Sequence, residues 1–118
     1  MEGIINNMKK WILSLSLLIL LSGCSSVTGE NEFLEKINSM EEALNGSDWE
    51  QLTSLGSNLE QLYRHNLWKI QLMGDEDEYE SLQESINHLN VAIEEQDITE
   101  IKLEMATVKT FLEDIYSL

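Results

Sequence analysis

The sequence predicts an all-α protein, an antiparallel up-down four-helix bundle built from two helical hairpins. Proline is absent, only 6 glycines occur in 118 residues, and helix formers such as Leu, Glu, Gln and Met dominate. Apolar residues recur at spacings of three and four along four segments, and no alternating strand pattern occurs. Short connections separate these segments, so neighbouring helices are expected to be antiparallel.

The first segment of the chain is predicted to be a secretion signal outside the bundle. Lys9 and Lys10 precede an apolar run from Trp11 to Leu21, which small residues follow. This order is typical of a signal peptide, and the run is shorter than the ~20 residues of a transmembrane helix. We therefore expect a lipoprotein signal peptide at residues 1–23, a polar tether at 24–29 and a four-helix domain at 30–118.

Cys24 is the single cysteine, so it forms no internal disulfide. The residues Leu21-Ser22-Gly23-Cys24 resemble a bacterial lipobox, in which the cysteine is diacylated and becomes the mature N-terminus. Two acyl chains, such as palmitate, suffice for stable membrane attachment. We predict lipidation of Cys24 and a cell-membrane protein that faces outside the cytoplasm. The alternative is an uncleaved signal segment that anchors the chain.

The first hairpin is predicted from two amphipathic segments. The first begins near Glu30 and ends at Gly46, where glycine accepts a left-handed conformation. Ser47 and Glu50 fit a capping box for the second, which extends to Met73 and stops at Gly74. The expected core faces are Phe33, Ile37, Met40 and Leu44, then Trp49, Leu52, Leu59, Tyr63, Ile70 and Met73, with Gly56 and Asn66 in register.

The second hairpin follows the same logic. Acidic residues 75–78 open the third helix, where they complement the positive end of the helix dipole. Asp97 is the expected cap of the fourth. The core faces are Tyr79, Leu82, Ile86, Leu89 and Ile93, then Ile98, Ile101, Met105, Val108, Leu112 and Ile115.

The two hairpins match each other when the sequence is shifted by 49 residues. Asp48 then falls on Asp97, and Ala43 falls on Ala92, without a gap. The shift indicates either a duplicated hairpin or a chance agreement of two amphipathic patterns. If the hairpins do not face each other within one chain, the alternative is an elongated pair that completes its core by forming a homodimer.

Charge restricts the class of partner. Cleavage before Cys24 removes Lys9, Lys10 and Glu2, and the remaining 95 residues hold 5 basic and 21 acidic side chains, a formal charge of −16. This charge argues against nucleic acid and against contact with anionic lipid headgroups. It suits solubility or a cationic partner.

No pattern indicates catalysis, a metal or a cofactor. Counted from Asp75, the acidic run has Glu80 and Ile86 where an EF-hand loop needs glycine and glutamate. His65 and His88 each lack a second histidine three or four residues away, as a helical zinc site would require. No nucleophile elbow or glycine-rich phosphate loop occurs. We expect a protein that is not an enzyme and has no cofactor.

One candidate site remains, a partner surface at His65, Trp68 and Leu72. At ~100° per residue, Trp68 lies ~180° from Leu59, the centre of the core face of its helix. Tryptophan is enriched at interface hot spots, so we expect a protein partner here. The competing interpretation is that the tether or a bend in the chain covers Trp68.

The domain resembles a family of short, membrane-anchored helical proteins of Gram-positive bacteria known as a domain of unknown function. The resemblance covers residues 45–95. Trp49 and Trp68 match family tryptophans, Glu78-Tyr79 matches a Glu-Ile pair, and Ser85-Ile86-x-x-Leu89 matches a Ser-Leu-x-x-Leu segment. Glu76 replaces a family histidine and Leu62 replaces another tryptophan. The resemblance implies a cell-surface helical protein without a known reaction.

These observations favour a lipid-anchored, extracytoplasmic binding or adaptor module at the membrane surface. The alternative is a small-ligand or cation-binding lipoprotein that serves a transporter. An adaptor needs an exposed apolar surface, and a ligand-binding protein needs a cavity with convergent polar groups. A structural spacer would need neither feature.

Overall fold

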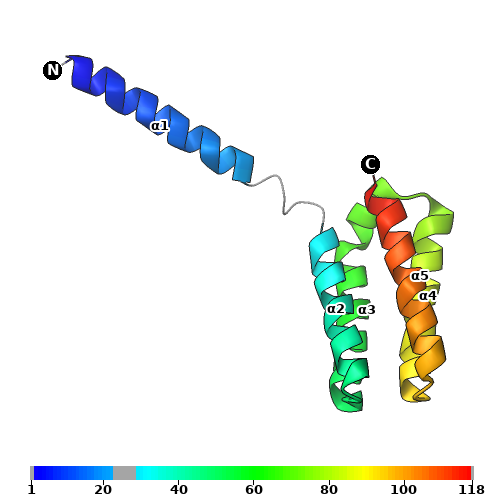
Figure 1. The fold of residues 1–118 in the computed structure, drawn as a ribbon. Helices are drawn as coiled ribbons and strands as arrows, with labels where there is room; N and C mark the ends of the chain where they lie inside the picture. The colour runs from blue at the N-terminus through cyan, green and yellow to red at the C-terminus, as the bar shows by residue number, and fades with distance from the viewer. Residues whose placement is uncertain (1, 23–28, 118) are drawn as a thin grey trace.

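The predicted all-α class is confirmed in the computed structural model, which describes residues 2–22 and 29–117, with side chains for 2–15 and 29–117. The described chain has five helices rather than four, because the segment predicted to be a signal is also helical (Figure 1). The helices are α1 (Glu2–Ser22), α2 (Glu30–Asn45), α3 (Trp49–Met73), α4 (Glu76–Glu94) and α5 (Ile98–Tyr116). No strand occurs in these residues.

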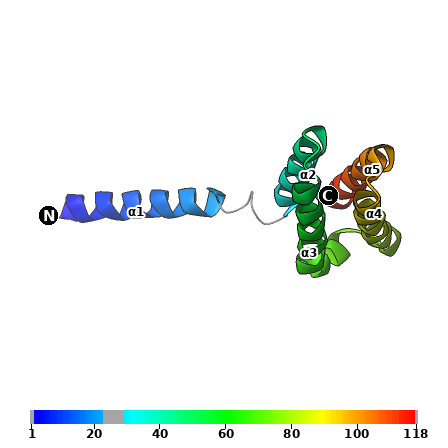
Figure 2. The same ribbon diagram turned by 90° about the horizontal axis from the view of Figure 1, so that it is seen from below.

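Helices α2 to α5 pack together as a helical bundle. Each packs on the next along the chain, and α5 also contacts α2 and α3. Figure 2, which views the bundle from below, shows α2 and α3 side by side and α4 beside α5. Within the described residues, α1 packs on none of the other helices.

The predicted core faces are largely buried. The buried apolar residues include Phe33, Ile37, Met40, Leu44, Leu52, Leu59, Tyr63, Ile70, Leu82, Ile86, Leu89, Ile93, Ile101, Met105, Val108, Leu112 and Ile115. The expectation for Ile98 is wrong, since it is 48% exposed. It is the first residue of α5, beside an exposed turn rather than between neighbouring helices. Trp49, Met73 and Tyr79 are only partly buried.

The turn between α2 and α3 corrects two expectations. Gly46 has φ −84°, and the left-handed residue is instead Ser47, with φ 53°. Ser47 is therefore not the cap of α3. The carboxylate of Asp48 accepts a 3.1 Å hydrogen bond from the backbone N–H of Gln51 and takes that role.

The turn between α4 and α5 has the same structure 49 residues later. Ser47 N donates to Leu44 O and Asp48 N donates to Ala43 O, the two hydrogen bonds of a Schellman motif. Gln96 N donates to Ile93 O and Asp97 N to Ala92 O in the same way. Gln96 has φ 55°, and Asp97 caps α5 by accepting from Glu100 N, as predicted. Both turns thus reverse the chain by identical local hydrogen bonds.

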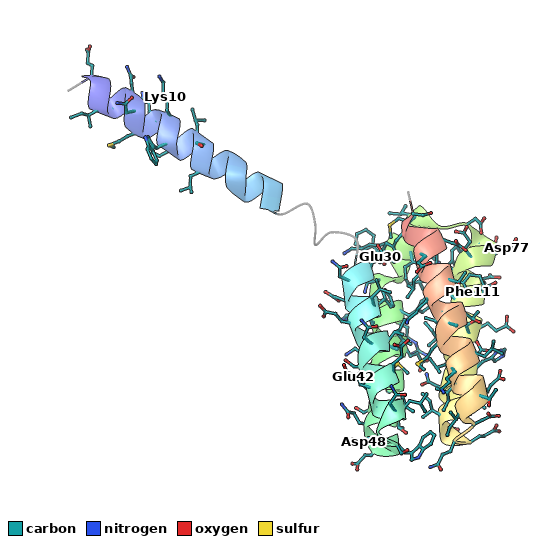
Figure 3. The ribbon with its side chains drawn as sticks, viewed as in Figure 1. Lys10, Glu30, Glu42, Asp48, Asp77 and Phe111 are labelled. Atoms are coloured by element: carbon teal, nitrogen blue, oxygen red, sulfur yellow. The ribbon has the colours of Figure 1, made fainter. Side chains whose placement is uncertain are left out.

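The acidic residues 75–78 form a capped helix start. Asp75 Oδ1 accepts from Glu78 N at 2.9 Å, and Glu78 Oε2 accepts from Asp75 N at 3.3 Å, which is a capping box. Figure 3 shows Asp77 at the same end of the bundle as Glu30, and Asp48 at the opposite end. The acidic run therefore serves to begin α4.

Gly56 allows α3 and α4 to approach closely. A Cβ at this position would lie 2.3 Å from Asn90 Oδ1 and 3.1 Å from Ile93 Cδ1. These distances are shorter than ordinary van der Waals contacts, so a larger residue would displace the side chains of Asn90 and Ile93. The space beside Gly56 on the core face of α3 is thus occupied by the side chains of Asn90 and Ile93 from α4.

Candidate functional site

The residues His65, Trp68 and Leu72, which we call the outer α3 surface, lie on one exposed face of α3. Trp68 is 61% exposed and Leu72 is 78% exposed, and His65 is exposed as well. The described part of the chain therefore does not cover Trp68. The Nζ atom of Lys69 lies 5.4 Å from the centroid of the Trp68 ring, within range of a cation–π interaction.

The opposite face of α3 fixes the orientation of this surface. Tyr63 and Ile70 are buried, and Tyr63 Oη donates a 3.0 Å hydrogen bond to the backbone oxygen of Tyr79 on α4. Burial raises the pKa of the Tyr63 hydroxyl, with smaller contributions from Tyr79 and Glu80. Because the inward face is held by packing and by this hydrogen bond, Trp68 is held outward.

A groove of about 650 Å³ adjoins the outer α3 surface, between α2 and α3. Most of its lining residues have polar side chains, and they carry both signs of charge. Its lining residues are Glu32, Glu35, Lys36, Ser39, Asn58, Gln61, Leu62, Arg64 and His65. His65 thus belongs to both features, which sequence reasoning did not foresee because the groove depends on how α2 lies against α3.

The point where the tether enters the bundle is tightly packed. Gly29 has φ 74°, and a Cβ there would lie 3.2 Å from Asn66 Oδ1 and 3.5 Å from Tyr116 Oη. Tyr116 also lies against Phe33, with 6.4 Å between ring centroids. Burial raises the pKa of the Tyr116 hydroxyl to about 12, and Glu30 and Glu32 add to the effect. Tyr116 Oη is buried without a hydrogen-bond partner in the described structure.

A second cluster on α4 and α5 was missed from the sequence. Glu104 is only 9% exposed, and its Oε2 atom has no hydrogen-bond partner in the described residues. His88 lies between Glu104 and Glu84, with Nδ1 3.7 Å from Glu104 Oε1 and Nε2 3.8 Å from Glu84 Oε1. The sequence did indicate its burial, because Glu104 lies three residues after Ile101 and four before Val108, on the core face of α5.

No metal centre is present among the residues that the structure describes. No group of three His, Cys, Asp or Glu side chains there is arranged to hold an ion. His65 and His88 lie on different helices, in the separate clusters given above.

Cys24, the predicted lipidation site, lies outside the described residues, as does most of the predicted tether. The preceding helix α1 exposes large apolar side chains along its described part, among them Ile4, Met8, Trp11, Ile12, Leu13 and Leu15. In the described chain, no helix combines the length and the apolar character that crossing a bilayer would require.

Comparison with known proteins gives one match. The model of a family described as a domain of unknown function (DUF4363) matches residues 25–118. The match is wider than the segment 45–95 that carries the resemblance in the sequence, and it includes all of α2 to α5. No curated protein and no solved structure matches the chain significantly.

Proposed function

The chain belongs to the DUF4363 family, and we propose that it is a lipid-anchored, extracytoplasmic binding or adaptor module that catalyses no reaction. The observation that carries this proposal is the outer α3 surface. Trp68 and Leu72 are mostly exposed on a helix whose other face is fully packed. A folded domain rarely exposes a large aromatic beside a leucine unless the pair contacts a partner.

The anchor is proposed from the sequence Leu21-Ser22-Gly23-Cys24 and the apolar helix before it. An exposed apolar α1 that packs on no other helix of the described chain suits a segment that inserts into a membrane before cleavage. Cys24→Ala should leave the precursor unprocessed or release the domain from the membrane fraction, whereas Ser26→Ala should change neither. Mass spectrometry of the N-terminal peptide checks the acyl group. An unmodified peptide with normal membrane retention would contradict the anchor.

We further propose that residues 30–118 form an antiparallel four-helix bundle of two repeated hairpins. The two turns share their left-handed residue, their cap and their backbone hydrogen bonds at a spacing of 49 residues. Proteolysis within Gly74-Asp75, the two-residue link between α3 and α4, should yield two helical fragments that stay associated. Fragments that separate on dilution would contradict the arrangement.

The adaptor role is tested with a photo-crosslinking amino acid in the anchored protein. Placed at Leu72, it should crosslink to a component of native membranes, whether lipid or protein. Placed at Leu103, which is exposed to a similar degree on α5, it should give little. Equal labelling at both positions would mean that the outer α3 surface is not a dedicated binding site.

The groove between α2 and α3 supports a second candidate, a small-ligand lipoprotein that serves a transporter. Glu32, Glu35 and Lys36 of α2 line it together with Arg64 of α3, so it offers groups of both charges to a small zwitterionic ligand. A zwitterionic amino acid or betaine should then raise the melting temperature of the protein but not of an Arg64→Gln variant. No shift with a panel of such ligands would exclude this candidate.

A further inference from the structure

The outer α3 surface lies in a stretch of α3 that lacks acidic residues. Within residues 24–118, the longest stretch without Asp or Glu is 61–74, the C-terminal half of α3. This stretch holds Arg64 and Lys69, two of the 5 basic residues expected in the mature chain. Residues 61–74 therefore carry a formal charge of +2, of which Arg64 is paired with Glu60 and Lys69 lies beside the exposed Trp68.

The cations of this stretch flank the exposed apolar residues. Lys69 lies over the ring of Trp68. Arg64 lies one turn before Trp68 and is 2.6 Å from Glu60, with its side chain 71% exposed. An exposed helix face that combines tryptophan, leucine and basic residues is typical of helices at the membrane interface. Basic residues there attract anionic headgroups, and the indole ring suits the headgroup level.

The end of α3 that carries this surface lies at the end of the bundle where the chain arrives from the predicted lipid anchor, although the chain enters against the inward face of α3. Gly29, the first described residue after the tether, packs against Asn66 of α3. Leu72 is six residues beyond Asn66, or about 9 Å along the helix axis. The five residue steps from Cys24 to Gly29 extend at most ~18 Å. Figure 1 shows the start of α2 and the ends of α3 and α5 at the same end of the bundle.

We propose that the outer α3 surface lies on the anionic headgroup layer of the membrane that holds the anchor, so that the bilayer itself is its partner. This inference rests on the proposed lipid anchor and names what the proposed binding surface contacts. The acid-rich remainder of the domain is repelled by the same headgroups, which selects a single orientation.

The test follows Trp68 fluorescence in the lipidated mature protein. Because cleavage before Cys24 removes Trp11, Trp49→Phe leaves Trp68 as the single tryptophan of residues 24–118. The protein is reconstituted in vesicles of phosphatidylcholine alone or of equal parts phosphatidylcholine and phosphatidylglycerol, each containing brominated phosphatidylcholine. We expect quenching of Trp68 by the brominated lipid, stronger in the anionic vesicles and weakened by salt.

Two charge variants provide a matched comparison. Lys69→Gln should lower the ratio of docked to free domain roughly fivefold, since one basic residue near an anionic surface contributes ~1 kcal/mol. Lys102→Gln removes the same charge from an exposed position on α5 and should leave quenching unchanged. An equal effect of both variants would mean that only net charge matters and would overturn the proposal.

The remaining outcomes separate the two proposals. If the protein does not float with the vesicles, the lipid anchor is refuted, and the docking proposal, which rests on the anchor, is refuted as well. Protein that floats while Trp68 is reached by aqueous acrylamide and not by brominated lipid refutes docking alone. Shielding of Trp68 in native membranes but not in pure lipid would assign the surface to a protein partner instead.

Discussion

The Nδ1 atom of His88 lies 3.7 Å from Oε1 of Glu104, too far for a hydrogen bond, although Glu104 is buried in the bundle. The histidine side chain is 57% exposed, so solvent weakens its interaction with the carboxylate. The second carboxylate oxygen has no partner in the described structure. Under the 49-residue shift, the equivalent position in the first hairpin is Leu55.

Replacing Glu104 with leucine should stabilise the protein. Glu104→Leu removes a poorly compensated buried carboxylate and restores the residue type of the first hairpin, so we expect the free energy of unfolding to rise by about 1–2 kcal/mol. Urea denaturation measures the change, and Glu113→Leu at an exposed position of α5 serves as the control, with little effect expected. A loss of stability in Glu104→Leu would show that the carboxylate makes a favourable interaction.

The two left-handed turn residues offer a paired prediction. Ser47→Gly and Gln96→Gly should each raise the free energy of unfolding by about 0.5–1 kcal/mol, because only glycine adopts a positive φ without strain. Gln83→Gly, on the exposed face of α4, should instead lower it by about 1 kcal/mol. Destabilisation by both turn variants would mean that their side chains make contacts that outweigh the backbone strain.

The exposed apolar pair should matter little for folding. Trp68→Ala combined with Leu72→Gln removes side chains that are mostly in solvent, so the melting temperature is expected to stay nearly constant. Leu59→Ala, at a fully buried position of the same helix, should cost about 2–5 kcal/mol. A comparable loss in the surface variant would place Trp68 in the core. In the free protein, Trp68 should emit as a solvated indole.

Tyr116 should make the protein sensitive to alkaline pH. Its hydroxyl pKa is raised from 10.0 to about 12 in the folded state, so the folded chain holds this proton more tightly than the unfolded chain. This contribution to stability is complete below pH 10 and is lost as pH rises towards 12. Tyr116→Phe should flatten the decline of unfolding free energy over that interval. The decline is measured by denaturation at each pH, and Tyr63 and Tyr79 remain in both proteins. An unchanged decline would contradict the burial of the hydroxyl.

Much of the fold was accessible from periodicity because the core is a single apolar face on each helix. The starts of α2 and α5 were predicted from Glu30 and Asp97. The capping box of Asp75 and Glu78 was not, because the sequence indicated only an acidic first turn of α4. The cap of α3 was misassigned to Ser47, since Ser-Asp offers two capping side chains in succession. The backbone decided between them, because Ser47 adopts the positive φ of the Schellman motif and Asp48, the next residue, accepts from Gln51 N.

Only those parts of the candidate site that lie on a single helix could be predicted from the sequence. The outer α3 surface follows from angular position alone, and the structure gives the exposure of Trp68 that the sequence left open. The groove beside His65 and the burial of Glu104 depend on which neighbouring helix covers each position. A pattern along one chain segment does not carry that information, so both were missed.

The repeated turns also bear on how quickly the domain folds. Each reversal is closed by hydrogen bonds between residues three to five positions apart, and each helix packs first on its neighbour in the chain. Native contacts are therefore dominated by short sequence separations, the condition under which loop closure is least costly in entropy and folding is fastest. Either hairpin can therefore form before the rest of the chain has folded, so that little apolar surface stays exposed during folding.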